Sequence, residues 1–161
     1  MRLKKTYSSR EVAALTGLSA RQLQLWHQGG LVAPAFPPHR TDAGGYTERR
    51  YTPIDVFELL VLADLRRKGF TVQQLHQILN ALRRHFGARL FEATGGGGSV
   101  QLLTDGTEIY VRTSRGEFYN LLKDPLQPLL VIGDEGILKE LSGKVRARSG
   151  TPSRGRRRAA G

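Results

Sequence analysis

The chain is 161 residues long, the size of one domain or of one domain with a small appendage. It contains no cysteine, which excludes disulfides, thiolate metal sites and thiol nucleophiles, and its net charge of +11 points to a polyanionic partner. No run approaches the ~20 apolar residues of a membrane span. The basic start has no apolar stretch behind it, so we expect no signal peptide.

The charge is distributed unevenly along the chain. Residues 1–90 carry 14 basic and 6 acidic residues, residues 91–143 carry 4 and 8, and residues 144–161 carry 7 basic residues and no acidic one. A basic front, an acidic middle and a basic tail predict three segments with different roles. Double-stranded DNA is the polyanion that we expect, and an anionic membrane surface is the alternative partner for the tail.

The first predicted elements are two short helices joined by a tight turn. A serine stands at the N-cap position of each helix, before residues 10–16 and before residues 20–28. Gly17 ends the first helix as a C-cap glycine does. Leu23 and Trp26 lie three residues apart and hold the second helix to the core. This pattern is typical of a helix-turn-helix.

A wing follows the two helices. Residues 35–45 are rich in proline and glycine and predict an extended loop, and residues 46–51 predict a short strand that returns from it. Together they indicate a β-hairpin wing that carries Arg40, Arg49 and Arg50.

Two longer helices come next. A Thr-Pro pair marks the start of a helix over residues 53–68. Thr71 caps a fourth helix, which has the strongest apolar periodicity in the chain and is interrupted at Gly87. Residues 89–92 predict one further turn, and the four glycines at 95–98 predict a flexible joint.

After the glycines the apolar pattern changes to a period of two. Residues 100–104 and 108–113 flank an Asp-Gly turn and predict a β-hairpin. Prolines bracket residues 125–128, which we expect to be irregular. Residues 129–132 predict a short buried strand and residues 136–141 a helical turn. A unit of this size is marginal alone, so it should pack on the front half or on a second copy of itself.

The predicted fold class is mostly α with a small β component. We expect a winged helix-turn-helix domain of four helices at residues 1–92 and a glycine-rich linker at residues 93–99. A small β-rich α+β unit at residues 100–143 would serve for dimerisation or partner binding. The basic tail at residues 144–161 has almost no apolar residues and should be disordered when free.

Four blocks of the front half resemble the DNA-binding domain of the MerR family of transcription regulators. They read REVAALTGLS from Arg10, RQLQLWHQGGLVAP from Arg21, RRYTPIDV from Arg49 and RRKGFTV from Arg66, in that order. The resemblance covers residues 7–86. It implies a winged helix-turn-helix, double-stranded DNA as the partner, a homodimer, and RNA polymerase engaged on promoter DNA that the dimer bends and untwists.

The chain departs from the family pattern in three places, one of which is the wing region at residues 35–48, which is longer and richer in proline and glycine. The family's recognition helix typically carries an Arg-Tyr pair, a second aromatic and an acidic residue, where this chain has Gln24, Leu25, Trp26 and His27. The helix before the glycines is also too short for the long antiparallel coiled coil through which many members dimerise. The small unit after the glycines is therefore our candidate for the dimer contact or for a protein partner.

The candidate site follows from a helix that lies in the major groove with its polar face on base edges. The wing would supply contacts to phosphate or to the minor groove. The candidate DNA-binding residues are Ser19, Arg21, Gln22, Gln24, Gln28, Arg40, Tyr46, Arg49 and Arg50. We expect no catalytic residue, no metal site and no cofactor, because no Ser/His/Asp set is found and the histidines lack carboxylates at metal spacing.

The predicted function is a sequence-specific DNA-binding transcriptional regulator, not an enzyme. It would act as a homodimer on an inverted-repeat operator, in the cytoplasm and associated with the nucleoid. Two alternatives stay open. One is an antitoxin-like DNA-binding protein whose C-terminal unit binds a protein partner. The other is an architectural protein that bends DNA with little sequence preference.

Overall fold

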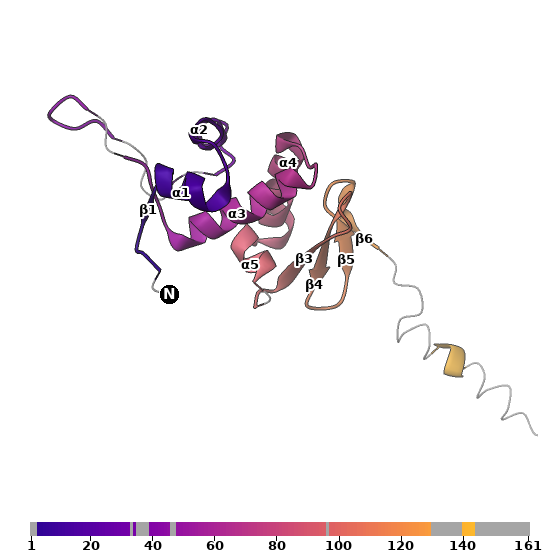
Figure 1. The fold of residues 1–161 in the computed structure, drawn as a ribbon. Helices are drawn as coiled ribbons and strands as arrows, with labels where there is room; N and C mark the ends of the chain where they lie inside the picture. The colour runs from indigo at the N-terminus through magenta and orange to yellow at the C-terminus, as the bar shows by residue number, and fades with distance from the viewer. Residues whose placement is uncertain are drawn as a thin grey trace, which may run out of the picture. The chain divides into compact units, whose positions relative to one another are not determined.

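The fold is given by a computed structural model of the chain (Figure 1). The chain divides into two units, residues 1–129 and residues 130–161, and all the elements named below belong to the first. The structure describes residues 3–32, 34, 39–45, 48–95, 97–129 and 140–143. Outside the described residues lie Tyr46, most of the strand predicted at 129–132, most of the helical turn predicted at 136–141 and the whole tail at 144–161.

The predicted helix-turn-helix is formed by α1 (Ser9–Thr16) and α2 (Ala20–Gln28). Each helix begins at a serine that forms a capping box, because the serine hydroxyl and the side chain three residues later each accept a backbone N–H. Gly17 ends α1 in the left-handed conformation, with φ of 76°. The turn is fixed to α3 (Pro53–Arg67), because Arg67 donates a hydrogen bond of 3.3 Å to the carbonyl of Thr16.

Gly17→Ala is expected to destabilise the protein by about 1–2 kcal/mol, because a side chain at this left-handed position brings Cβ too close to the backbone. Chemical denaturation of the variant and of the wild type measures the difference. Gly45→Ala is the matched control, since Gly45 does not have a positive φ. Equal losses for the two variants would contradict the role of the turn.

Two longer helices and a short one complete the helical part. α3 is capped by Thr52 and α4 (Val72–Phe86) by Thr71, and Gly87 ends α4 with φ of 59°. The predicted ends therefore agree with the structure to within a residue or so. The turn predicted at 89–92 is α5 (Leu90–Thr94).

A buried carboxylate attaches α5 to α3. Glu58 of α3 is buried; one of its oxygens pairs with the guanidinium of Arg89, and the other accepts the backbone N–H of Phe91 at 3.2 Å. A second acid, Asp55, lies 3.7 Å from the same guanidinium. The bond to Glu58 raises the pKa of Arg89, and nearby negative charge adds to the effect. The cation is thereby held at the start of α5.

A two-stranded sheet joins the start of the chain to the base of the wing. β1 (Tyr7–Ser8) pairs antiparallel with β2 (Arg50–Tyr51), with Tyr7 opposite Tyr51. Tyr51 is 1% exposed, and burial raises the pKa of its hydroxyl. A strand was predicted over residues 46–51. Within the described residues, only the last two of these form a strand, which is β2.

The second half of the unit is a four-stranded antiparallel sheet in the order β3-β4-β5-β6 (Figure 1). Its strands are β3 (Val100–Thr104), β4 (Ile109–Thr113), β5 (Phe118–Asn120) and β6 (Asp124–Leu129). The predicted hairpin is confirmed as β3 and β4. The irregular conformation predicted for 125–128 was wrong. Those residues lie in β6, which is an edge strand. Prolines are tolerated there because an edge strand uses only some of its N–H groups in hydrogen bonds to its one neighbouring strand.

The sheet packs on the helices and shares their hydrophobic core. Val100, Ile109 and Val111 on the sheet are buried in the same apolar cluster as the helices. The rings of Phe86 on α4 and Tyr119 on β5 meet at 69°, with centroids 5.2 Å apart. The small unit at residues 100–143 was predicted to pack on the front half or on a second copy, and in the structure its sheet packs on the helices of the front half. The limits predicted for the domain, the linker, the small unit and the tail stay predictions.

Stability should depend on pH through the β4–β5 region. An ion pair of 2.9 Å with Lys123, and a hydrogen bond from Asn120, hold the pKa of Glu108 below its usual value of 4.5. A group whose pKa is lowered by folding stabilises the native state above its unfolded pKa, and this stabilisation is lost as pH falls through the folded pKa. Glu108→Gln should therefore weaken the loss of stability below about pH 4.5.

Thermal unfolding of wild type and Glu108→Gln between pH 3 and pH 7 checks this expectation. Glu117→Gln is the matched control, because the Glu117 carboxylate accepts the hydroxyl of Tyr119 and pairs with no cation among the described residues. If Glu108→Gln follows the wild-type curve at every pH, the ion pair does not contribute as described.

Candidate nucleic-acid interface

One face of α2 is exposed. Leu23 and Trp26, on the inner face, are 2% and 5% exposed and fix the helix to the core. The outward-facing residues follow a spacing of three, four and seven, which places them on one side of a helix. We call them the α2 stripe; they are Arg21, Gln24, Leu25 and Gln28, all exposed.

Two of the predicted residues also serve the start of α2. The Ser19 hydroxyl accepts the N–H of Gln22 at 3.0 Å, and Oε1 of Gln22 accepts the N–H of Ser19 at 2.9 Å. A glutamine that pairs with adenine uses both its donor and its acceptor. The acceptor of Gln22 is engaged within the helix start, whereas no such bond is present for Gln24 or Gln28 among the described contacts. The stripe glutamines are therefore better suited to read a base.

Leu25 is an exposed residue that is not among the predicted DNA-binding residues. It is 50% exposed and lies between the polar members of the α2 stripe. An aliphatic side chain at this place can contact the methyl group of thymine. The signal was present in the sequence, because Leu25 is four residues after Arg21.

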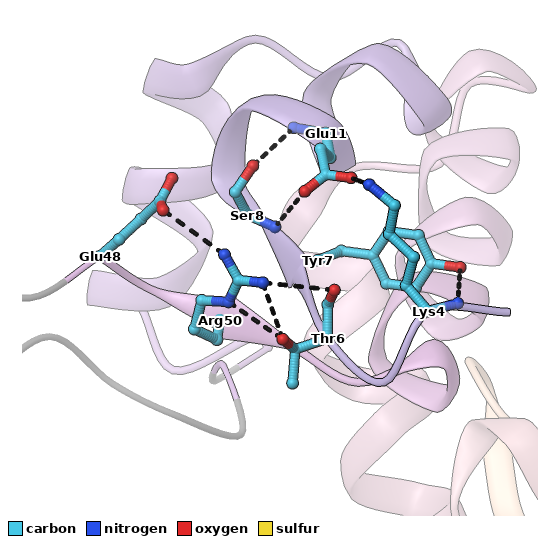
Figure 2. Close-up of polar contacts among 7 residues, drawn as sticks. All are labelled: Lys4, Thr6, Tyr7, Ser8, Glu11, Glu48 and Arg50. Atoms are coloured by element: carbon cyan, nitrogen blue, oxygen red, sulfur yellow. Dashed lines mark hydrogen bonds and ion pairs between the residues drawn. The ribbon is translucent and has the colours of Figure 1, made fainter.

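The wing base is held by a polar network around Arg50, which Figure 2 shows. Nε and one terminal nitrogen of Arg50 donate to the hydroxyl of Thr6 at 3.0 and 2.8 Å, and the other terminal nitrogen is 3.6 Å from Glu48. The hydroxyl of Ser8 caps α1 beside it through the N–H of Glu11. Arg50 thus ties β1 to the wing, and only its partly exposed side (38%) remains for a phosphate.

The other predicted wing residues differ in exposure. Arg40 is exposed, next to a turn in which Thr41 donates two bonds to the carbonyl of Gly45, from its N–H at 2.6 Å and from its hydroxyl at 2.9 Å. Arg49 is half-buried, and its Nε is buried with no hydrogen-bond partner among the described residues. Tyr46 lies outside the described residues.

A second basic group lies at the start of the chain, close to the wing base. Lys4 pairs with the carboxylate of Glu11, and its backbone N–H donates to the hydroxyl of Tyr7 at 3.3 Å (Figure 2). The bond to Lys4 holds the pKa of Glu11 below its usual range. Lys4 is thereby partly neutralised, whereas Lys5 and Arg40 are exposed and have no ion pair among the described residues.

The front of the chain matches a known family. Residues 7–82 match the model described as MerR HTH family regulatory protein. These residues form a MerR-type helix-turn-helix domain. The MerR domain thus contains β1, α1, α2, β2, α3 and most of α4, with the α2 stripe on its second helix.

The chain is also similar to proteins named as HTH-type transcriptional regulators. The chain is 27% identical over 139 residues to an uncharacterized HTH-type transcriptional regulator of Mycobacterium tuberculosis, covering 86% of this chain and 57% of that protein. It is 35% identical over 69 residues to the HTH-type transcriptional regulator CueR of Vibrio cholerae, covering 43% of this chain and 45% of that protein. The chain thus spans about half the length of the curated relatives that it matches.

A solved structure is also similar. It is the crystal structure of HiNmlR, a MerR family regulator lacking the sensor domain, bound to promoter DNA. The match has 26% identity and a TM-score of 0.36, and covers 45% of this chain and 51% of that one.

The similarity to the mycobacterial regulator extends beyond the MerR domain. A match over 139 of 161 residues must include residues 23–139, and therefore the four-stranded sheet. The residues of the sheet therefore lie within the matched stretch.

No helix within the described residues is long and apolar enough to cross a membrane. No group of three or more His, Cys, Asp or Glu in the same ranges is arranged to hold a metal ion.

Proposed function

We propose that the chain is a sequence-specific DNA-binding transcriptional regulator that binds an inverted-repeat operator as a dimer. The observation that carries this proposal is the α2 stripe on a MerR-type domain. Its four side chains are exposed on one face, and the opposite face of the same helix is anchored by two buried residues. A rigidly held helix with a polar outer face fits the major groove.

The chemistry of the stripe suggests how bases are read. The guanidinium of Arg21 can donate two hydrogen bonds to the O6 and N7 atoms of guanine, and Gln24 or Gln28 can bond to both N6 and N7 of adenine. Arg40 and the exposed side of Arg50 would contact phosphates, which position the domain without reading sequence. The basic tail would add affinity that depends on salt and not on sequence.

A dimer supplies the second half of the proposed operator. Two recognition helices related by a two-fold axis read two half-sites about 34–36 Å apart, one turn of DNA. The chemistry requires no cofactor and no catalytic residue, and we propose none. The regulator would work on cytoplasmic, nucleoid DNA, where RNA polymerase is the partner that promoter binding affects.

The experiment that tests the proposal is fluorescence anisotropy of the full chain on the DNA upstream of its own gene and on random DNA, over a salt series. Tighter binding to the upstream DNA that persists at about 150 mM salt would support the proposal. Equal binding that disappears with salt would show that the upstream DNA contains no operator for this chain. A genome-wide selection of bound fragments would then separate a distant operator from an architectural protein.

A further inference from the structure

The two edges of the four-stranded sheet differ in composition. The outer strand β6 contains Pro125 and Pro128 and starts at an acidic residue. The opposite outer strand, β3, has the sequence VQLLT, with no proline and no charged residue. Natural sheets usually protect an edge with proline or charge to prevent pairing with another chain. In this sheet β6 is protected and β3 is open to pairing.

Among the described residues, the backbone groups on the outer side of β3 have no strand partner. The N–H of Ser114 donates to the carbonyl of Ser99 at 3.0 Å, which makes this pair a hydrogen-bonded one in the antiparallel ladder. Such pairs alternate with non-bonded ones, so Gln101 and Leu103 bond to β4. Among the described residues, β3 pairs with no strand except β4. The residues whose backbone groups point outward are Val100, Leu102 and Thr104.

Apolar surface continues from this edge onto α3. A cavity of about 330 Å³ lies between α3 and β3, lined mainly by leucine, valine and isoleucine side chains that include Leu60 and Leu102, with Asp64 and Lys68 at its side. Further along α3, Ile54, Phe57 and Leu60 are each more than a third exposed, and Phe57 packs edge-on against Phe91. Contiguous exposed apolar surface of this kind marks an interaction site.

We propose that β3 pairs antiparallel with β3 of a second copy of this chain, about a two-fold axis at Leu102. In this register Leu102 faces Leu102 of the second copy, Gln101 faces Leu103, and Val100 faces Thr104. Every outward N–H and carbonyl group then has a partner. The two sheets become one continuous sheet, with the apolar cavity of each copy beside the axis.

The absence of charge on β3 favours a second copy over a different protein. A two-fold contact brings a surface against itself, so a strand that carries net charge would repel its own copy. The uncharged β3 meets no such repulsion. In the proposed register each of its residues faces an uncharged residue of the second copy. This pairing deepens the proposed function and rests on it, because it gives the surface that brings two α2 stripes to an inverted repeat.

A charge-pair experiment tests both the interface and the register. Gln101→Lys combined with Leu103→Lys places lysine against lysine across the proposed axis, whereas Gln101→Lys combined with Leu103→Glu places lysine against glutamate. Sedimentation velocity of the full chain should show a dimer for the wild type and for the Lys/Glu variant. The Lys/Lys variant should dissociate at least about tenfold more readily, because like charges are directly opposed.

The matched control places the same two lysines on the other edge, as Gln127→Lys with Leu129→Lys in β6. This control should stay dimeric, and circular dichroism with thermal unfolding verifies that all variants are folded. A monomeric wild type, or a Lys/Lys variant as dimeric as the wild type, would overturn the proposed interface. Equal dissociation of the Lys/Lys and Lys/Glu variants would overturn the proposed register.

DNA binding separates this inference from the proposed function. The wild type and the Lys/Lys variant are compared on the upstream DNA and on random DNA. If the lysines do not affect the dimer and the chain still prefers the upstream DNA, the proposed β3 interface is wrong and the proposed function is retained. If the lysines dissociate the dimer but the wild type binds both DNAs equally, the proposed interface is retained and the proposed function is wrong.

Discussion

Trp26→Ala is expected to destabilise the protein by about 3–5 kcal/mol, the usual cost of truncating a buried tryptophan to alanine. Trp26 is 5% exposed and fixes the inner face of α2 to the core. The variant loses both apolar contact and the fixed position of the α2 stripe. Chemical denaturation measures the first effect, and DNA binding well below the unfolding midpoint measures the second.

The control for this variant is its neighbour on the same helix. Leu25→Ala removes a side chain that is 50% exposed, and it should change the free energy of unfolding by no more than about 0.5 kcal/mol. If Leu25→Ala costs as much as Trp26→Ala, the assignment of inner and outer faces of α2 would be wrong.

Arg21→Ala is expected to reduce discrimination between operator and random DNA by about 1–3 kcal/mol, up to a factor of about 100 in relative affinity. The reason is that a guanidinium placed on a guanine is the commonest specific contact in the major groove. Anisotropy titrations on both DNAs give the ratio. The free energy of unfolding should change little, since Arg21 is exposed.

Arg112→Ala is the matched variant for Arg21→Ala. It removes the same charge from an exposed position on β4, outside the MerR domain. It should weaken binding to both DNAs by a similar small factor and leave their ratio unchanged. A loss of discrimination in Arg112→Ala but not in Arg21→Ala would move the reading surface from α2 to the sheet.

The helix limits could be predicted from the sequence because their causes are local. The serine and threonine caps bond to backbone groups three residues away, and Gly17 and Gly87 occupy left-handed positions directly after the helices that they end. The hairpin of β3 and β4 is equally local, since an Asp-Gly turn lies between its strands. The α2 stripe follows from helical spacing once the two buried residues are known.

Contacts between distant parts of the chain could not be predicted in the same way. The bond between Arg50 and Thr6 joins residues 44 positions apart, and Glu58 reaches Arg89 across 31 positions. A two-residue strand has no periodicity, so β1 gave no signal. In β6 the prolines indicated a loop. The structure shows that β6 pairs with β5 alone and is therefore an edge strand, which tolerates proline.

The pairing of β1 with β2 has a practical consequence for work with split forms of this protein. The wing loop at residues 41–45 leaves from a base that is closed by strand pairing and by the Arg50–Thr6 bonds. A protease cut or an inserted peptide in this exposed loop would leave that base intact. The two fragments should remain associated, which makes the loop a suitable place to insert a reporter that tests the proposed DNA binding.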